Sequence, residues 1–369
     1  MDRRSFLAAA GAALSAYPGL AQNSGKQTQN VILVTTDGLR WEDLFRGADP
    51  AQINKTTGGV SNPDALKARF WRDSPEERRE LLMPFVWKTV AKHGVLYGNR
   101  DRGSDAYVTN GMNFSYPGYS ELLTGAPDDR INSNDQIDNP NVNVLEWLNT
   151  RESFRNRIAA FGAWDRFYYI LNSRRSGLLV NDGYTPLHTN TPNDRIDLLN
   201  RVKAETEIWG SEAQDAPVFL LANEYFRTAR PRVFYLALGE TDEWAHGGRY
   251  DLYLNAAHRV DRYVEDLWNL AQSMDQYRGR TTLILAVGHG RGAEGASWRS
   301  HGQKVPESKY VWMGIMGPDT PAPGERANAE PVTQSQVAAT LAALLGEDYH
   351  AAFPKTGKPI AEAIQPAAK

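Results

Sequence analysis

Length and composition restrict what this chain can be. It has 369 residues, 41% of them hydrophobic, so it can bury one large core, and disordered or collagen-like architectures are excluded. It contains no cysteine, which excludes disulfides, thiolate metal sites and cysteine nucleophiles. With 41 basic and 44 acidic residues the net charge is −3, and we expect no nucleic-acid binding. Any metal ion must therefore be bound by oxygen and imidazole, and the seven histidines become informative.

The first 21 residues are typical of an export signal. Arg3 and Arg4 precede Ser-Phe-Leu and a short alanine-rich stretch that ends near Ala21, which is similar to a twin-arginine signal peptide with a signal peptidase site. That stretch is too short to span a bilayer, and no later stretch reaches the roughly 20 apolar residues that a span requires. We expect a mature chain, 22–369, that forms a single domain with loop insertions and is periplasmic or secreted.

Short apolar runs alternate with helical patterns along the rest of the chain. The runs are rich in β-branched residues and predict buried strands of a parallel sheet at 30–36, 157–164, 232–238, 281–287 and 311–316. Helical patterns lie at 75–93, 251–274 and 333–345. Long loops rich in Gly, Pro, Asn and Asp are expected at 47–63 and 126–140. The alternation predicts an α/β fold, a doubly wound, mainly parallel central sheet with helices on both faces.

Carboxylates and histidines gather just after the predicted strands, and they are Asp37, Asp242, His246, His289 and His301. The carboxyl ends of parallel strands form the ligand crevice of such sheets. Asp242 and His246 are four residues apart, a spacing that places two ligands on one side of a helical turn. Each residue alone is explained equally well as a turn residue or a buried histidine. Because they recur at one predicted edge, a metal site is the favoured interpretation.

Ser115 lies at the start of a predicted short helix. Pro117 suits the first turn of that helix and Gly125 suits its end. The free N–H groups and the dipole of a helix N-terminus favour an anion, although a serine there is also a common N-cap. Next to the candidate metal ligands, Ser115 is a candidate nucleophile.

Six segments in order resemble the alkaline phosphatase superfamily, most closely its nucleotide pyrophosphatase/phosphodiesterase-like and phosphatase branches. They are VILVTTDGLR, NFSYPGYSELLTG, DEWAH, GHG, SHG and QVAATLAALLG, and they extend from 30 to 346. The resemblance implies a metal-dependent phosphoesterase with two divalent ions, expected to be Zn²⁺, that forms a phosphoserine on Ser115 and acts on a small phosphorylated substrate. The family's ligand sets correspond to Asp242, His246 and His301 for one ion and to Asp37, His289 and the hydroxyl of Ser115 for the other.

The resemblance also suggests Asn134 as a donor to the phosphate oxygens, because related phosphodiesterases carry an asparagine in a similar loop. An asparagine in a turn-rich loop is the simpler explanation. Tyr116, Tyr119, Trp164 and Trp244 are candidates for stacking on a nucleobase or aryl group. The alternative is a dianionic monoester held by Arg40 and Arg291, so the choice between monoester and diester stays open.

Two positions depart from the family pattern. The family has an aspartate before the histidine of its Asp-His-Gly motif, and this chain has Gly288, so we expect a weaker second ion, with Glu243 or Glu294 as possible substitute ligands. A catalytically weakened relative that binds one metal ion or phosphorylated ligands is therefore an alternative. Tyr119 stands where a sulfatase has arginine, which argues against a formylglycine sulfatase. A phosphotransferase or mutase remains a further alternative, although the chain lacks room for the extra mutase domain.

Overall fold

The structure is a computed structural model that describes residues 25–189 and 191–364. The expected export signal, 1–21, lies outside the described residues. The central sheet has eight strands in the order β5-β4-β6-β1-β7-β8-β2-β9. In chain order they are β1 (Asn30–Thr36), β2 (Gly94–Tyr97), β4 (Ile158–Gly162), β5 (Leu179–Asp182), β6 (Val233–Leu238), β7 (Thr281–Val287), β8 (Met313–Met316) and β9 (Gly324–Glu325). A small second sheet pairs β3 (Ala106–Tyr107) with β10 (Val332–Thr333).

The sheet is mainly parallel, as the sequence predicts. β1 pairs in parallel with β6 and β7, and β4 pairs in parallel with β5 and β6. β8 is antiparallel to both of its neighbours, a feature that the apolar run at 311–316 does not reveal. All residues of β1, β6 and β7 are buried, which agrees with the nearly continuous apolar sequences of these strands.

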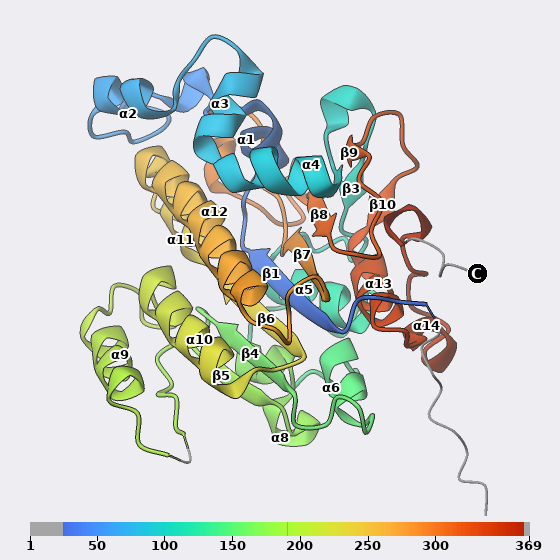
Figure 1. Ribbon diagram of the computed structural model, residues 1–369. Coiled ribbons are helices and arrows are strands. Elements are labelled where there is room, and N and C mark those ends of the chain that lie inside the picture. Colours follow the sequence, from blue (N-terminus) through green and yellow to red (C-terminus); the bar gives the residue numbers. More distant parts are fainter. Residues whose placement is uncertain (1–24, 190, 365–369) are drawn as a thin grey trace, which may run out of the picture.

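Helices cover both faces of the sheet (Figure 1). The helices are α1 (Trp41–Arg46), α2 (Pro63–Phe70), α3 (Pro75–Leu82), α4 (Ala91–His93), α5 (Ser115–Thr124), α6 (Val144–Asn149), α7 (Phe167–Ile170), α8 (Ser173–Ser176), α9 (Asp194–Glu205), α10 (Asp215–Ala229), α11 (Glu240–His246), α12 (Tyr250–Ser273), α13 (Val337–Leu344) and α14 (Tyr349–Ala352). α10 and α12 pack together on one face, and α5, α6 and α13 pack together on the other. The expected doubly wound arrangement is confirmed.

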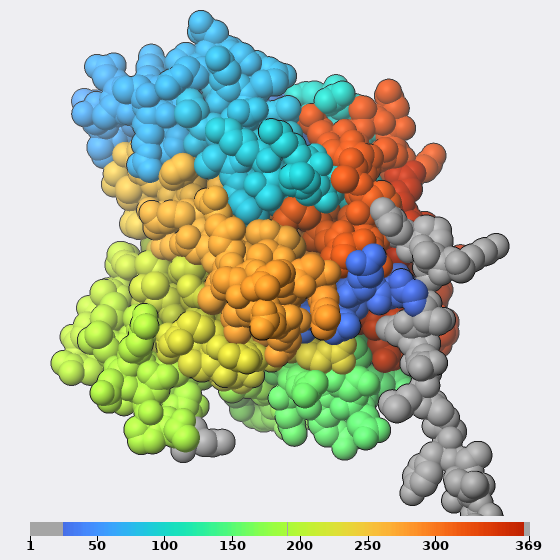
Figure 2. Space-filling view, in the orientation of Figure 1, coloured from blue at the N-terminus to red at the C-terminus, as the bar shows by residue number. Residues whose placement is uncertain are grey.

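The predicted helix at 75–93 is interrupted. α3 ends at Leu82, and Met83 has φ −132° and ψ 70° because the residue before a proline, here Pro84, is pushed out of the α region. A π-helical turn, Val86–Val90, then leads into α4. In Figure 2 the segment that carries α2 and α3, in blue, forms a lobe beside the start of α12, in orange.

The three central strands end in register. Thr36 of β1 lies opposite Leu238 of β6 and opposite Val287 of β7. The residues that follow these three strands therefore emerge side by side at one edge of the sheet. In the described part of the chain, no helix combines the length and the apolar character needed to cross a membrane.

Candidate metal centre and nucleophile

The sheet edge brings the candidate ligands together. The N–H of Asp37 donates to the carbonyl of Leu238 at 3.0 Å, and the N–H of Gly288 donates to the carbonyl of Thr36 at 3.0 Å. α11 begins two residues after β6 and carries Asp242 and His246 on successive turns. The four-residue spacing thus acts as predicted, with both side chains facing the strand ends.

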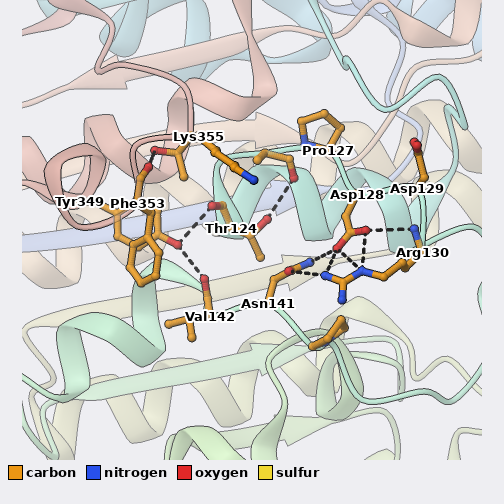
Figure 3. Close-up of a pocket in the computed structure, with 13 residues that line it drawn as sticks. Thr124, Pro127, Asp128, Asp129, Arg130, Asn141, Val142, Tyr349, Phe353 and Lys355 are labelled. Atoms are coloured by element: carbon orange, nitrogen blue, oxygen red, sulfur yellow. Dashed lines mark hydrogen bonds and ion pairs between the residues drawn. The ribbon is translucent and has the colours of Figure 1, made fainter.

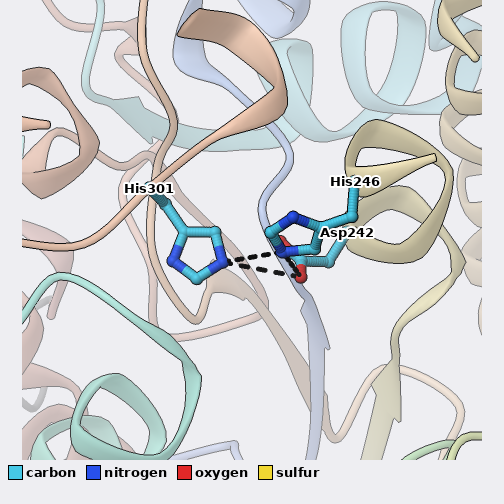
Figure 4. Close-up of side chains that lie close together, drawn as sticks. All are labelled: Asp242, His246 and His301. Atoms are coloured by element: carbon cyan, nitrogen blue, oxygen red, sulfur yellow. Dashed lines mark hydrogen bonds and ion pairs between the residues drawn. The ribbon is translucent and has the colours of Figure 1, made fainter. Parts of the chain in front are cut away.

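Asp242, His246 and His301 form the first candidate metal group (Figure 4). Nε2 of His246 lies 2.9 Å from Oδ2 of Asp242 and 2.9 Å from Nε2 of His301. Nε2 of His301 lies 3.8 Å from the same carboxylate oxygen. Three ligand atoms therefore converge on one point, and all three residues are those predicted from the sequence.

Asp37, Asp242 and His289 form the second candidate metal group. Nδ1 of His289 lies 2.8 Å from the carbonyl oxygen of Gly290, so Nδ1 carries the hydrogen and Nε2 of the neutral ring is an acceptor. This Nε2 lies 3.0 Å from Oδ1 of Asp37 and 3.5 Å from Oδ1 of Asp242. Oδ1 of Asp37 is buried and accepts no hydrogen bond from any described residue. Nε2 of the neutral His289 ring and the two carboxylate oxygens are all acceptors, so a cation bound between them would satisfy all three atoms.

Ser115 is the first residue of α5, and Phe114 occupies the N-cap position. Its hydroxyl oxygen lies 3.2 Å from Nε2 of His289. The side chain therefore faces the second metal group and does not cap the helix. The expected free N–H groups at the helix start are largely taken, because Tyr116 donates to Asn134 and Gly118 donates to the carbonyl of Phe114.

This geometry differs from a serine hydrolase triad. In a triad the serine and the aspartate bind opposite nitrogens of the histidine ring. Here Ser115 and Asp37 both face Nε2 of His289, and Nδ1 is used by a backbone carbonyl. A histidine held at Nδ1 by a carbonyl and presenting Nε2 to carboxylates is typical of a metal ligand.

Charges within the site shift its pKa values. Burial raises the pKa of Asp242, but Arg291 and His301 outweigh this effect and hold it well below its usual range. Burial, followed by the neighbouring His289, lowers the pKa of His301 to about 2. Burial also opposes the charged form of His289, but Asp37 raises its pKa above the usual value. These directions favour an ionised Asp242 and a neutral His301, the states that metal ligands require, whereas the raised pKa of His289 favours a protonated ring as long as no ion is bound.

The two groups differ in how well they fit a divalent ion. The first offers one carboxylate and two imidazoles, the three protein ligands typical of a catalytic zinc site with an open position. The second offers Asp37 and His289, shares Asp242 with the first group and has no carboxylate at Gly288. The first group fits the ion well, and the second fits it less well.

Neither substitute carboxylate expected from the sequence joins the second group. Glu294 is exposed and forms a capping box with Ser297 at the start of a short 3₁₀ helix. Burial raises the pKa of Glu243, and its carboxyl belongs to neither metal group. The missing carboxylate is therefore not replaced by the residues proposed for it.

The space beside Gly288 is filled. A Cβ atom added there would lie 2.6 Å from Oδ1 of Asp37 and 2.9 Å from Cζ of Tyr119. Tyr119 is 1% exposed, so its ring has little room to move. Gly118 is also required, because a Cβ at that residue would lie 2.1 Å from the carbonyl oxygen of Gly288.

We predict that Gly288→Ala lowers the free energy of unfolding by about 1–3 kcal/mol, the usual cost of overpacking. The matched control is Gly210→Ala, because an added Cβ at Gly210 meets nothing within 4 Å. Urea unfolding of both variants measures the difference. Equal stability of the two variants would show that the site accepts a side chain at 288 without strain.

Asn134 lies at the start of α5, next to the turn that carries Ser115. Its Oδ1 accepts a hydrogen bond from the N–H of Tyr116 at 3.0 Å. Its backbone carbonyl accepts one from Nε of Arg166 at 2.8 Å. Because Oδ1 is fixed on the first turn of α5, the side-chain amide leaves its two N–H donors without a partner among the described residues.

Several other candidates have structural roles. Tyr116 and Tyr119 are buried, and Tyr116 donates to the carbonyl of Ile137, so neither is placed to stack on a substrate. Trp164 and Trp244 are half-buried and remain candidates. The guanidinium of Arg40 is fully buried and pairs with Asp43 at 2.7 Å, which removes it as a ligand for phosphate.

The sequence interpretation missed two features of the site. Arg291 is buried and pairs with Asp242, whereas its position in the sequence suggested a substrate contact. Glu212 is buried near Asp37 and Asp242, and burial, followed by the neighbouring Glu243, raises its pKa well above the usual range. Glu212 lies in a loop without a recognisable motif, so no sequence signal indicated it.

A cavity of about 810 Å³ lies elsewhere, at the C-terminal end of α5 (Figure 3). It is lined by residues that include Thr124, Arg130, Asn141 and Lys355. Arg130 and Asn141 both bind the carboxylate of Asp128 there. None of the lining residues belongs to the metal groups, so this cavity is distinct from the candidate site.

The fold has clear relatives among solved structures. No protein-family model and no curated protein matches this chain. The wild-type alkaline phosphatase PafA is similar, with a TM-score of 0.56 at 10% identity, over 92% of this chain and 99% of that chain. Phosphonate monoester hydrolase SpPMH from Silicibacter pomeroyi gives 0.57 at 14% identity, over 93% of this chain and 78% of that chain. A protein in the alkaline phosphatase superfamily from Vibrio parahaemolyticus gives 0.51 at 14% identity, over 94% and 72%.

The chain has the fold of the alkaline phosphatase superfamily. The fold predicted from six ordered segments is therefore confirmed. Because the sequence identities are low, these similarities establish the alkaline phosphatase fold and leave the chemistry to be argued from the site.

Proposed function

We propose that the protein is an exported, metal-dependent phosphoesterase that hydrolyses phosphate monoesters or diesters through a phosphoserine on Ser115. The observation that carries this proposal is the position of the Ser115 hydroxyl. It lies at the start of α5, 3.2 Å from His289 and at the edge where both metal groups open. A hydroxyl beside carboxylate and imidazole ligands is the arrangement expected for a nucleophile that attacks phosphorus.

Ser115, the first metal group and His289 have different roles in the proposed hydrolysis. Ser115 Oγ loses its proton and forms a bond to phosphorus, while the bond from phosphorus to the leaving ester oxygen breaks and that oxygen takes up a proton. Water then displaces Ser115 Oγ and releases phosphate from a monoester, or a phosphate monoester from a diester. Asp242, His246 and His301 would hold a divalent ion, which would supply Lewis acidity towards the ester oxygens. Nε2 of His289, when it carries no ion, is placed to hold the proton of Ser115.

In a two-ion form, Asp37, His289 and Ser115 would hold the second ion, with Zn²⁺ the expected metal. This group has one carboxylate fewer than the family pattern, because Gly288 supplies none. That deficit supports the second candidate function, a weakened relative that binds one ion. The sequence of 1–21, which is similar to a twin-arginine export signal, supports the proposal of a periplasmic or secreted location.

The experiment compares hydrolysis of p-nitrophenyl phosphate, bis-p-nitrophenyl phosphate and p-nitrophenyl sulfate by zinc-loaded protein. We expect turnover of at least one phosphate ester and an acid-stable phosphoserine on Ser115 after quenching. Turnover of the sulfate ester alone would replace the proposal with a sulfatase. Turnover of none of the three would favour the weakened relative.

We predict that Asn134→Ala lowers kcat/KM for the phosphate ester by about 10- to 100-fold, the usual worth of a hydrogen bond to a charged group. The matched control is Asn132→Ala, because Asn132 is exposed in the same loop and donates only to the carbonyl of Asp129. Steady-state kinetics of both variants decide the matter. An unchanged kcat/KM in Asn134→Ala would leave Asn134 with the role of fixing the helix start.

A further inference from the structure

The guanidinium of Arg291 is built into the metal centre. Arg291 is 1% exposed, and its Nε donates to the carbonyl of Trp298 at 2.8 Å. One Nη donates to the carbonyl of Arg299 at 2.7 Å, and the other pairs with Oδ1 of Asp242. Because two backbone carbonyls hold the planar group on one side, its charge has a fixed position.

The two oxygens of Asp242 are divided between different partners. Oδ2 faces His246 at 2.9 Å and His301 at 3.8 Å. Oδ1 pairs with Arg291 and lies 3.5 Å from Nε2 of His289. The first metal group therefore keeps a free carboxylate oxygen, and the second must share its oxygen with a cation that is already present.

Gly38 provides the room for this pair. It has φ 59°, and a Cβ added to it would lie 2.3 Å from Oδ1 of Asp242 and 2.6 Å from Nη1 of Arg291. The residue after Asp37 thus has both the left-handed conformation and the lack of a side chain that the close approach requires. A side chain at residue 38 would therefore disturb the ion pair of Asp242 and Arg291.

The charge balance opposes a second ion. Asp37 and Asp242 supply two negative charges and Arg291 supplies one positive charge, since Gly288 contributes no carboxylate. A second divalent ion would therefore bind beside a fixed guanidinium and a first ion, and Asp37 would be the only carboxylate of its group that is not already paired with Arg291.

We propose that Arg291 takes the place of the second metal ion, so that this chain holds one divalent ion, at Asp242, His246 and His301, and the guanidinium supplies the other positive charge of the site. The proposal rests on the proposed function only in assigning an ion to the first group. It makes Arg291 the residue that determines how many ions bind.

The experiment counts ions. Metal-free protein is titrated with Co²⁺ by calorimetry, and Co²⁺ absorption and elemental analysis after dialysis report the coordination and the content. We expect one tight equivalent in the natural chain and in Asp37→Asn, and none in His246→Ala, whose side chain is half exposed. Two tight equivalents in the natural chain, reduced to one by Asp37→Asn, would overturn the proposal.

Variants of Arg291 test the guanidinium itself. Arg291→Met is expected to tighten binding of a second equivalent by at least about tenfold, and Arg291→Lys, which keeps the charge, is expected to stay at one. The control is Arg40→Met, which removes another fully buried arginine that pairs with Asp43 outside the site. Loss of the first ion in both Arg291 variants would show that Arg291 positions Asp242, and would overturn the proposal.

Failure of the one-ion proposal and failure of the proposed function give different results. If Arg291→Met does not fold, the natural chain, Asp37→Asn and His246→Ala still decide the number of ions. One ion without phosphoester hydrolysis would defeat the proposed function alone, whereas two ions with hydrolysis would defeat this inference alone.

Discussion

Ser115→Ala is expected to reduce phosphoester hydrolysis by at least about 10³-fold and to abolish the phosphoserine, because it removes the attacking oxygen. The Ser115 side chain does not cap α5, and its hydrogen-bonding contact is with His289 at 3.2 Å. The free energy of unfolding should therefore change by about 1 kcal/mol or less. Initial rates, together with mass spectrometry of the acid-quenched protein, measure both effects.

The matched control is Ser120→Ala on the same helix. Ser120 is buried, its hydroxyl accepts a hydrogen bond from Asn139 at 2.9 Å, and it belongs to neither metal group. This variant should fold and keep its activity. Substantial hydrolysis by Ser115→Ala would mean that water attacks phosphorus directly, and the covalent mechanism would be rejected.

Asp242→Asn is expected to lose the metal ion and to destabilise the protein at the same time. Asp242 provides an oxygen to each metal group and is the counter-charge of the buried Arg291. Removing one partner of a buried ion pair costs about 3–5 kcal/mol, because the other charge stays buried without compensation. The loss of stability should appear even in metal-free protein, since the ion pair forms without a metal.

Asp43→Asn separates these two effects. Asp43 is the partner of the other buried arginine, Arg40, and it also accepts hydrogen bonds from the hydroxyls of Tyr250 and Tyr253. Asp43→Asn should lower the free energy of unfolding by a similar amount but leave the metal-ion content unchanged. Urea unfolding of the metal-free variants and elemental analysis of the loaded ones give the comparison. Normal ion binding by Asp242→Asn would remove Asp242 from the metal centre.

The surroundings of Gly288 and the position of Arg291 explain why an aspartate at residue 288 would not simply restore a second metal site. From the sequence, Gly288 is a gap in a two-ion site. In the structure, Oδ1 of Asp37 and the ring of Tyr119 fill the space beside Gly288, and a guanidinium stands next to the shared carboxylate of Asp242. A single Gly288→Asp substitution therefore meets a packed and positively charged neighbourhood, not an empty ligand position.

The sequence by itself determined most of the central sheet and most of the candidate metal ligands. Continuous apolar runs predicted β1, β6 and β7 because strands buried on both faces need no polar residues, and the order of polar residues after them predicted Asp37, Asp242 and His289. The α11 spacing of Asp242 and His246 is local in the chain, so a sequence pattern contains it.

Only the tertiary structure decided the contacts between distant residues. Arg40 and Arg291 look alike in the sequence, each three residues or fewer from a candidate ligand, yet one pairs with Asp43 and the other with Asp242. Glu212 approaches the site from a separate loop, and Ser115 turns its hydroxyl to His289 across the sheet edge. Such pairings depend on how strands and loops pack, because the type of a residue does not determine the direction in which its side chain points. The sequence therefore identifies the candidate ligands, and under our proposal the packing of Arg291 determines how many ions they hold.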